Sequence, residues 1–144
     1  MKESFSFVPV GVIHSPYRDL KDIPRQGFMA PETQAILEVF EEYAPAASTL
    51  KPGGRYVLLF VFDKSEGHPL TCLTFGGAGE ERGLFSTRSP ERINPIGLSE
   101  ITVKQVDGRF VTFTGVDMLD QTPVLDMKPV IRDEGQQTPQ GERQ

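Results

Sequence analysis

The residues best able to do chemistry in this sequence stand in its central stretch, residues 83–99. This stretch holds Arg88, Arg92 and Asn94 among prolines, glycines and hydroxyl residues. Each proline removes a backbone donor and disfavours helix at the preceding residue, so we expect a rigid, shaped loop here. Arginines on a rigid loop can bind a polar or anionic ligand, but they can equally cap turns and pair with surface carboxylates.

Two other polar stretches also have proline at their corners. Near the start, His14-Ser-Pro-Tyr leads through a charged spacer to Pro24, Arg25 and Gln26, and near the end residues 117–129 form a second such loop. His14 could contact a ligand or could be a hydrogen-bonded structural imidazole. If the strands between the three stretches close into one sheet, the loops can gather into one site.

Size and composition are those of one globular domain. The chain has 144 residues, of which 38% are hydrophobic and 24% charged. Its first residues lack the apolar segment of a secretory signal, and no run approaches the roughly 20 apolar residues of a membrane helix, so a cytoplasmic location is expected. The net charge of -5 argues against strong nonspecific binding to nucleic acid.

The single cysteine, Cys72, excludes an internal disulfide. With two histidines in the whole chain, it leaves no thiolate-rich metal site, and no metal is expected. Cys72 stands in an apolar strand pattern and is interpreted as a small core residue rather than a nucleophile.

Six segments have the composition and alternation of strands: residues 5–14, 35–40, 55–63, 70–75, 96–106 and 109–116. The nearly continuous apolar run of residues 55–63 is expected to be central and buried on both faces. Asp107-Gly108 predicts a two-residue hairpin turn between the last two segments. Residues 33–43 leave helix or strand open, with strand preferred for 35–40. About six strands with few helices indicate an all-β barrel or sandwich.

The end of the chain differs in composition from the rest. Residues 133–144 contain no bulky apolar residue and are expected to be a disordered tail. The predicted domain therefore covers residues 1–132.

Taken together, the three loops resemble those of the TsaA/TrmO-like family. The matching motifs, in chain order, are Gly11-Val-Ile-His-Ser-Pro, Pro24-Arg-Gln, Phe85-Ser-Thr-Arg-Ser-Pro, Asn94-Pro-Ile-Gly-Leu-Ser and Thr122-Pro-Val-Leu-Asp-Met-Lys-Pro. The resemblance implies an all-β fold with minor helix: a small closed β-barrel of about six or seven strands in a single domain. It also implies a homodimer with S-adenosyl-L-methionine as cofactor, which methylates N6 of threonylcarbamoyladenosine beside the anticodon of tRNA.

The resemblance further implies which residues contact the cofactor near the subunit interface. They are Pro24, Arg25, Gln26, Asp63, Lys64, Arg88, Leu98, Asp120, Gln121, Thr122 and Pro123. Asp126 and Lys128 are the candidate catalytic residues that position the acceptor, with a salt bridge that locks the last loop as the alternative. Arg92 and Lys104 could meet tRNA phosphates or could be solvated surface charges.

The sequence departs from the family pattern, which commonly has proline at Ile93, histidine near Asp63, glycine at Gln121 and an aromatic residue at Val130. Gln121 matters most, because glycine permits a positive φ or a close ligand approach. Two alternatives therefore stay open. One is a non-catalytic, dimeric binding or regulatory barrel that keeps an adenosine-type ligand site, and the other is methyl transfer to a different acceptor.

Overall fold

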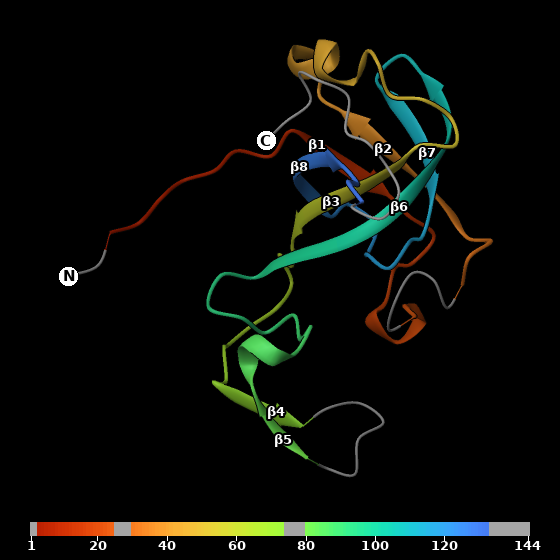
Figure 1. The fold of residues 1–144 in the computed structure, drawn as a ribbon. Helices are drawn as coiled ribbons and strands as arrows, with labels where there is room; N and C mark the ends of the chain where they lie inside the picture. Colours follow the sequence, from red (N-terminus) through yellow and green to blue (C-terminus); the bar gives the residue numbers. More distant parts are fainter. Residues whose placement is uncertain (1–2, 25–29, 74–79, 133–144) are drawn as a thin grey trace.

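The computed structural model describes residues 3–24, 30–73 and 80–132. Six antiparallel strands form one sheet that closes on itself, in the order β1-β2-β7-β6-β3-β8, with β8 paired back to β1 (Figure 1). Their bounds are β1 Gly11–His14, β2 Gln34–Val39, β3 Arg55–Val61, β6 Ile96–Asp107, β7 Phe110–Thr114 and β8 Pro123–Pro129. The prediction of a mostly β fold is confirmed. Closure into a ring leaves none of these six strands with a free edge.

Short 3-10 helices supply the minor helix content. They are η1 (Leu20–Asp22), η3 (Glu41–Ala47) and η4 (Leu84–Ser86). Pro45 lies inside η3 without ending it. None of the helices in the described residues is long and apolar enough to cross a membrane.

The core fills the inside of the ring with alternate residues of each strand. Along β2 the side chains alternate between exposed or half-buried and buried, because successive residues of a strand point to opposite faces. The fully buried side chains include Ile13, Leu37, Leu58, Ile101, Val103, Val111, Phe113 and Val124. The expected burial of both faces of the central strand is wrong: in β3 Leu58 and Phe60 are buried, whereas Val57, Leu59 and Val61 are half-buried on the outer face.

Two sequence predictions hold in detail. The ambiguous segment at residues 35–40 is a strand, β2. Strands β6 and β7 form a hairpin at Asp107-Gly108, where Gly108 has a φ of 63°. This positive φ is what a tight hairpin turn requires and glycine readily adopts.

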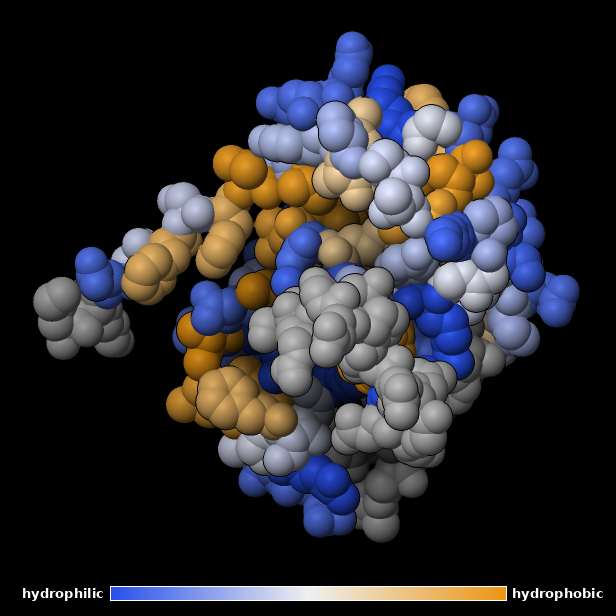
Figure 2. Space-filling view, turned by 45° about the horizontal axis from the view of Figure 1, so that its top comes forward, coloured by the Kyte–Doolittle hydropathy of each residue, from blue (hydrophilic) through white to orange (hydrophobic). Residues whose placement is uncertain are grey.

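The first predicted strand is shorter than the sequence pattern indicated. Pairing to β2 and β8 begins only at Gly11, and residues 3–10 carry no strand. Phe5 and Phe7 are 77% and 73% exposed on a segment that leaves the body of the molecule (Figures 1 and 2). The alternation of large and small residues therefore overstated the strand, since a pattern cannot show that a partner strand is missing.

One of the six predicted strands, at residues 70–75, is not part of the ring. The predicted strand at residues 70–75 gives β4 (Thr71–Leu73), which pairs only with β5 (Glu81–Gly83) in a two-stranded hairpin beyond the ring, while residues 74–75 lie outside the described residues (Figure 1). Cys72 is on this hairpin and only half-buried, so its interpretation as a core residue is wrong. The ring is completed by β8, within the stretch predicted to be a polar loop.

The antiparallel order of the ring decides where the loops meet. The carboxyl ends of β1, β3 and β7 and the amino ends of β2, β6 and β8 lie at one end, which we call the site end. The connection with η1 and the β4–β5 hairpin both lie at this end, whereas η3 and the β6–β7 turn lie at the opposite end (Figure 1). Three stretches that are far apart in sequence are thereby brought to one end of the fold.

Candidate functional site

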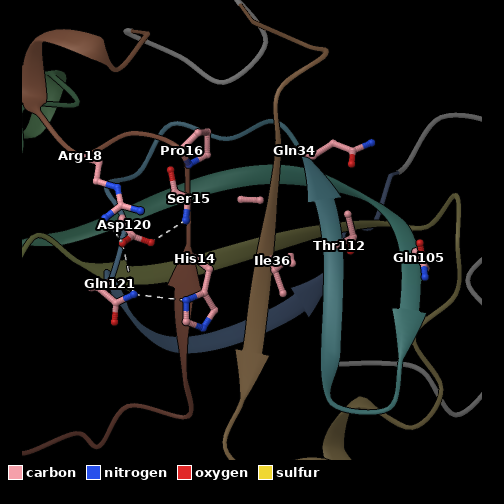
Figure 3. A pocket seen from close by; sticks show the side chains of 11 residues that line it. His14, Ser15, Pro16, Arg18, Gln34, Ile36, Gln105, Thr112, Asp120 and Gln121 are labelled. Carbon is pink, nitrogen blue, oxygen red and sulfur yellow. Dashed lines mark hydrogen bonds and ion pairs between the residues drawn. The ribbon is translucent and has the colours of Figure 1, made fainter.

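An open hollow of about 740 Å³ lies at the site end, over the outer surfaces of β1, β2 and β7 (Figure 3). Its lining is mostly polar: His14, Ser15, Pro16, Arg18, Gln34, Ala35, Ile36, Gln105, Thr112, Asp120 and Gln121. Side chains on the outer face of the strands form its floor, and the turns after β1 and before β8 form one wall. The volume falls within the range of small-molecule sites, and amides, hydroxyls and charged groups are available to orient a ligand.

Asp120 joins these two turns. Its Oδ1 accepts the backbone N–H of Ser15 at 2.9 Å, and its own N–H donates to the carbonyl of Tyr17 at 2.8 Å. Arg18 lies 3.8 Å from Oδ2. Burial opposes ionisation of this carboxyl, but the hydrogen bonds from Ser15 and Gln121 and the charge of Arg18 outweigh it, so the pKa of Asp120 lies below its ordinary value. Asp120 is therefore a carboxylate at neutral pH.

A chain of polar contacts runs from this turn across the outside of the ring. Gln121 contacts His14, whose Nε2 lies 2.8 Å from Glu38 Oε1, and Arg109 Nη1 donates to Glu38 Oε2 at 3.1 Å. The hydrogen bond with His14, followed by that with Arg109, lowers the pKa of Glu38. Both ring nitrogens of His14 are thus engaged, as expected of a hydrogen-bonded structural imidazole, and the ring also lines the hollow.

The central loop forms a second cluster at the site end. Arg88 is exposed, and its Nη1 donates to the carbonyl of Leu98 at 3.1 Å. Leu98 is 45% exposed on the outer face of β6. The structure therefore brings the guanidinium of one predicted cofactor residue to the backbone of another, ten residues further along the chain.

Arg92 has the other role that the sequence left open. Its Nη1 donates to the carbonyls of Thr87 and Ser89 at 2.9 and 3.1 Å, and its Nη2 to that of Leu84 at 3.3 Å. The guanidinium therefore fastens the loop that follows η4. This contact pattern is that of a turn-capping arginine rather than a phosphate ligand.

The remaining predicted cofactor residues are placed as follows. Asp63 and Lys64 form an exposed turn directly after β3, and Pro24 is half-buried after η1. Thr122 is buried, and its hydroxyl donates to the carbonyl of Leu119 at 2.7 Å, while Pro123 begins β8. Arg25 and Gln26 lie outside the described residues.

The two candidate catalytic residues do not line the hollow. Asp126 and Lys128 lie further along β8, opposite Leu59 and Val57 of β3. Lys128 Nζ is 2.9 Å from Asp126 Oδ2, and both side chains are about half exposed. The salt bridge that the sequence offered as the alternative is therefore present.

Several lining residues were missed by the sequence reading. Gln34 and Thr112 project from β2 and β7, and Gln105 from β6. Each occupies an outward position of its strand, although Gln34 precedes the strand that was predicted from residue 35. They come together through the pairing of β2 with β7, which joins residues 72 to 80 positions apart, and of β6 with β7. The described residues contain no group of three or more His, Cys, Asp or Glu side chains that could hold a metal ion.

Comparisons with known proteins agree with this fold. Residues 12–134 match the family model described as the tRNA-methyltransferase O N-terminal domain. A probable S-adenosyl-L-methionine-binding protein of Pyrococcus abyssi is 33% identical over 123 residues, covering 85% of this chain and 66% of the relative. The tRNA (adenine(37)-N6)-methyltransferase of Escherichia coli is 34% identical over 137 residues, covering 89% of this chain and 58% of the enzyme.

The same relationship appears in three dimensions. The crystal structure of TrmO from Pseudomonas aeruginosa superposes with a TM-score of 0.74 at 30% identity, covering 90% of this chain and 57% of that one. The chain thus spans between about half and two thirds of the length of these relatives. On the match of the family model and the agreement of fold, the chain belongs to the tRNA-methyltransferase O N-terminal domain family.

Proposed function

We propose that this chain binds S-adenosyl-L-methionine and transfers its methyl group to N6 of an adenine in tRNA. The finer proposal is that the acceptor is threonylcarbamoyladenosine beside the anticodon. The observation that carries the proposal is the gathering at the site end of Asp63 and Lys64, of Arg88 with Leu98, and of the turn that begins at Asp120. The names of the relatives, a cofactor-binding protein and tRNA methyltransferases, support the same activity.

The described residues suit such a cofactor chemically. S-adenosyl-L-methionine supplies an electrophilic methyl group and presents an adenine ring, ribose hydroxyls, a carboxylate and an amine. Leu98 offers an exposed apolar surface for a ring, and the guanidinium of Arg88 has donors beyond its bond to Leu98 for a carboxylate. The ionised Asp120 and the turn at Lys64 offer an acceptor and a cation for the remaining polar groups.

Catalysis in this proposal is mainly a matter of alignment, because holding two reactants in line replaces a bimolecular encounter. Asp126 and Lys128 are proposed to orient the acceptor and guide the departing proton. Their salt bridge leaves both side chains about half exposed, so a substrate can reach them. Neither residue lines the hollow, so replacing them tests the proposed catalytic role separately from cofactor binding.

We also propose that the protein acts as a dimer. The outer face of β6 carries Ile96 and Leu98, which are 40% and 45% exposed, and neighbouring β3 adds the half-buried Val57, Leu59 and Val61. An apolar outer sheet face of this kind suits burial against a second copy. A cofactor held by Leu98 would then lie beside the interface.

The first experiment is calorimetric titration with S-adenosyl-L-methionine, with the oligomeric state recorded on the same sample. We expect saturable binding at roughly micromolar strength, about -8 kcal/mol. Arg88→Ala should weaken this binding at least several-fold, whereas the matched control Arg82→Ala, an exposed arginine on the β4–β5 hairpin, should not. Unchanged affinity in Arg88→Ala would remove Arg88 from the site.

The second experiment tests the chemistry with radiolabelled cofactor and tRNA from cells that lack the modification. Label in the tRNA supports the proposed enzyme. Cofactor binding without label in tRNA would instead favour a different acceptor. No detectable cofactor binding would favour the alternative of a non-catalytic binding or regulatory module.

A further inference from the structure

Gln121 has an unusual backbone conformation for its residue type. Its φ is 69°, and it is the one non-glycine residue with a positive φ in the described part of the chain. Glycine is the residue that adopts this conformation without steric cost, so a glutamine here is strained. Such outliers persist where the surroundings hold them, and they gather at functional sites.

Backbone and side chain both hold Gln121 in place. Its N–H donates to the carbonyl of Ile13 at 2.7 Å, which joins the turn to β1. Its side-chain Nε2 lies 3.4 Å from Asp120 Oδ2 and 3.3 Å from His14 Nδ1 (Figure 3). The side chain therefore points along the wall of the hollow and connects a carboxylate to an imidazole.

The Asp120 carboxylate determines the orientation of the Gln121 side-chain amide. An ionised Asp120 can only accept hydrogen bonds, so the Gln121 atom that faces it must be the donor Nε2. The same Nε2 faces His14 Nδ1, and this nitrogen must then be an acceptor without a proton. The proton of a neutral imidazole consequently resides on Nε2, which faces the Glu38 carboxylate at 2.8 Å.

We propose that Gln121 is a positioning residue whose Nε2 donates to His14 Nδ1 and so holds the ring as its Nε2–H tautomer, with Nε2 directed at Glu38 and Nδ1 closed to a ligand. Asp120 then retains its negative charge toward the hollow, for a cationic or hydrogen-bond-donating group of a ligand. This consequence for the ligand rests on the proposed function, whereas the tautomer of His14 does not. Gln121 would thus occupy the second ring nitrogen of His14, so that Asp120 rather than the imidazole is the group of this wall that meets the ligand.

The test is nitrogen NMR of the histidine rings in the full chain at about pH 7.5, where protonated and unprotonated ring nitrogens are distinguished directly. The chain has two histidines, and the exposed His68 serves as the internal reference. We expect His14 to carry a proton on Nε2 and none on Nδ1. A proton on Nδ1 of the wild-type ring would overturn the proposal.

Variants at Gln121 separate the side chain from the backbone. Gln121→Glu keeps the length of the side chain but removes the donor to Nδ1, so the His14 Nδ1 resonance should move from its wild-type position. Gln121→Gly relieves the strain and removes the amide, so its melting temperature should be no lower than that of the wild type while the His14 Nδ1 resonance moves. A ring unaffected by both substitutions, in variants that fold, would refute the role of Gln121. Neither measurement needs a methyl acceptor, so a failed transfer assay leaves this test intact.

Discussion

Replacing Arg92 tests whether the central loop depends on an internal clamp. In Arg92→Ala the carbonyls of Thr87 and Ser89 lose their hydrogen bonds, whereas the carbonyl of Leu84 still accepts the N–H and the hydroxyl of Thr87. The loss of two hydrogen bonds, at about 1 kcal/mol net each, lowers the free energy of unfolding by about 2 kcal/mol. For a chain of this length that corresponds to a drop in melting temperature of about 6 °C.

The assay is thermal unfolding followed by circular dichroism, with two matched variants. Arg88→Ala removes one exposed hydrogen bond and should cost less than about 1 kcal/mol. Arg92→Lys keeps the charge but cannot span several carbonyls from a planar fork, so it should lose nearly as much stability as Arg92→Ala. Melting of Arg92→Ala within about 1 °C of the wild type would refute the clamp. Wild-type stability of Arg92→Lys together with a reduced tRNA affinity of Arg92→Ala would favour a phosphate contact instead.

Three further predictions concern other parts of the fold. Because the folded-state pKa of Asp120 lies below its unfolded value of 3.8, its ionised form stabilises the protein above that pH, and this contribution is lost as the pH falls through the folded pKa. Acid unfolding of Asp120→Asn should accordingly show a weaker pH dependence in this range, and an identical acid profile would contradict the assignment. Gly97→Ala should cost about 1–3 kcal/mol in urea unfolding, because the added Cβ would lie 2.4 Å from the ring of buried Phe60; a neutral effect would mean that the ring can move. Lys128→Ala should change stability by less than about 1 kcal/mol, because its ion pair is exposed, so a large loss of methyl transfer in this folded variant would support a catalytic role and full activity would exclude one.

The sequence was most informative where the signal was local. The Asp107-Gly108 turn, the strand at Gln34–Val39 and the strand at Arg55–Val61 follow from turn chemistry and from short runs of β-branched, aromatic and apolar residues, and the structure has all three. The motifs that carry the family resemblance are equally local, and the match of residues 12–134 to the family model agrees with them. Residue types at fixed spacing were thus sufficient for the fold class and the family.

Tertiary pairing decided the rest. Strand β8 is bounded by Pro123 and Pro129 and carries a charged pair on its outer face, so its sequence predicts a polar loop. It is a strand because β1 and β3 pair with it on its two sides. In the opposite direction, residues 5–9 have a strand pattern but are in no strand of the described structure. A strand is stabilised by hydrogen bonds to its neighbours, and a single sequence does not contain the identity of those neighbours.

The candidate site also combines features that depend on short stretches of sequence with contacts that depend on the fold. The sequence by itself determined the family and the loops that carry the candidate residues, because these depend on residue type and short spacing. Only the closed ring determined that Gln121 lies against His14, 107 residues away, and that Gln34 and Thr112 line the same hollow. Arg92 likewise had two roles open in the sequence, and only the positions of three backbone carbonyls decided between them. Contacts of this kind depend on distances between atoms that the folded chain alone brings together.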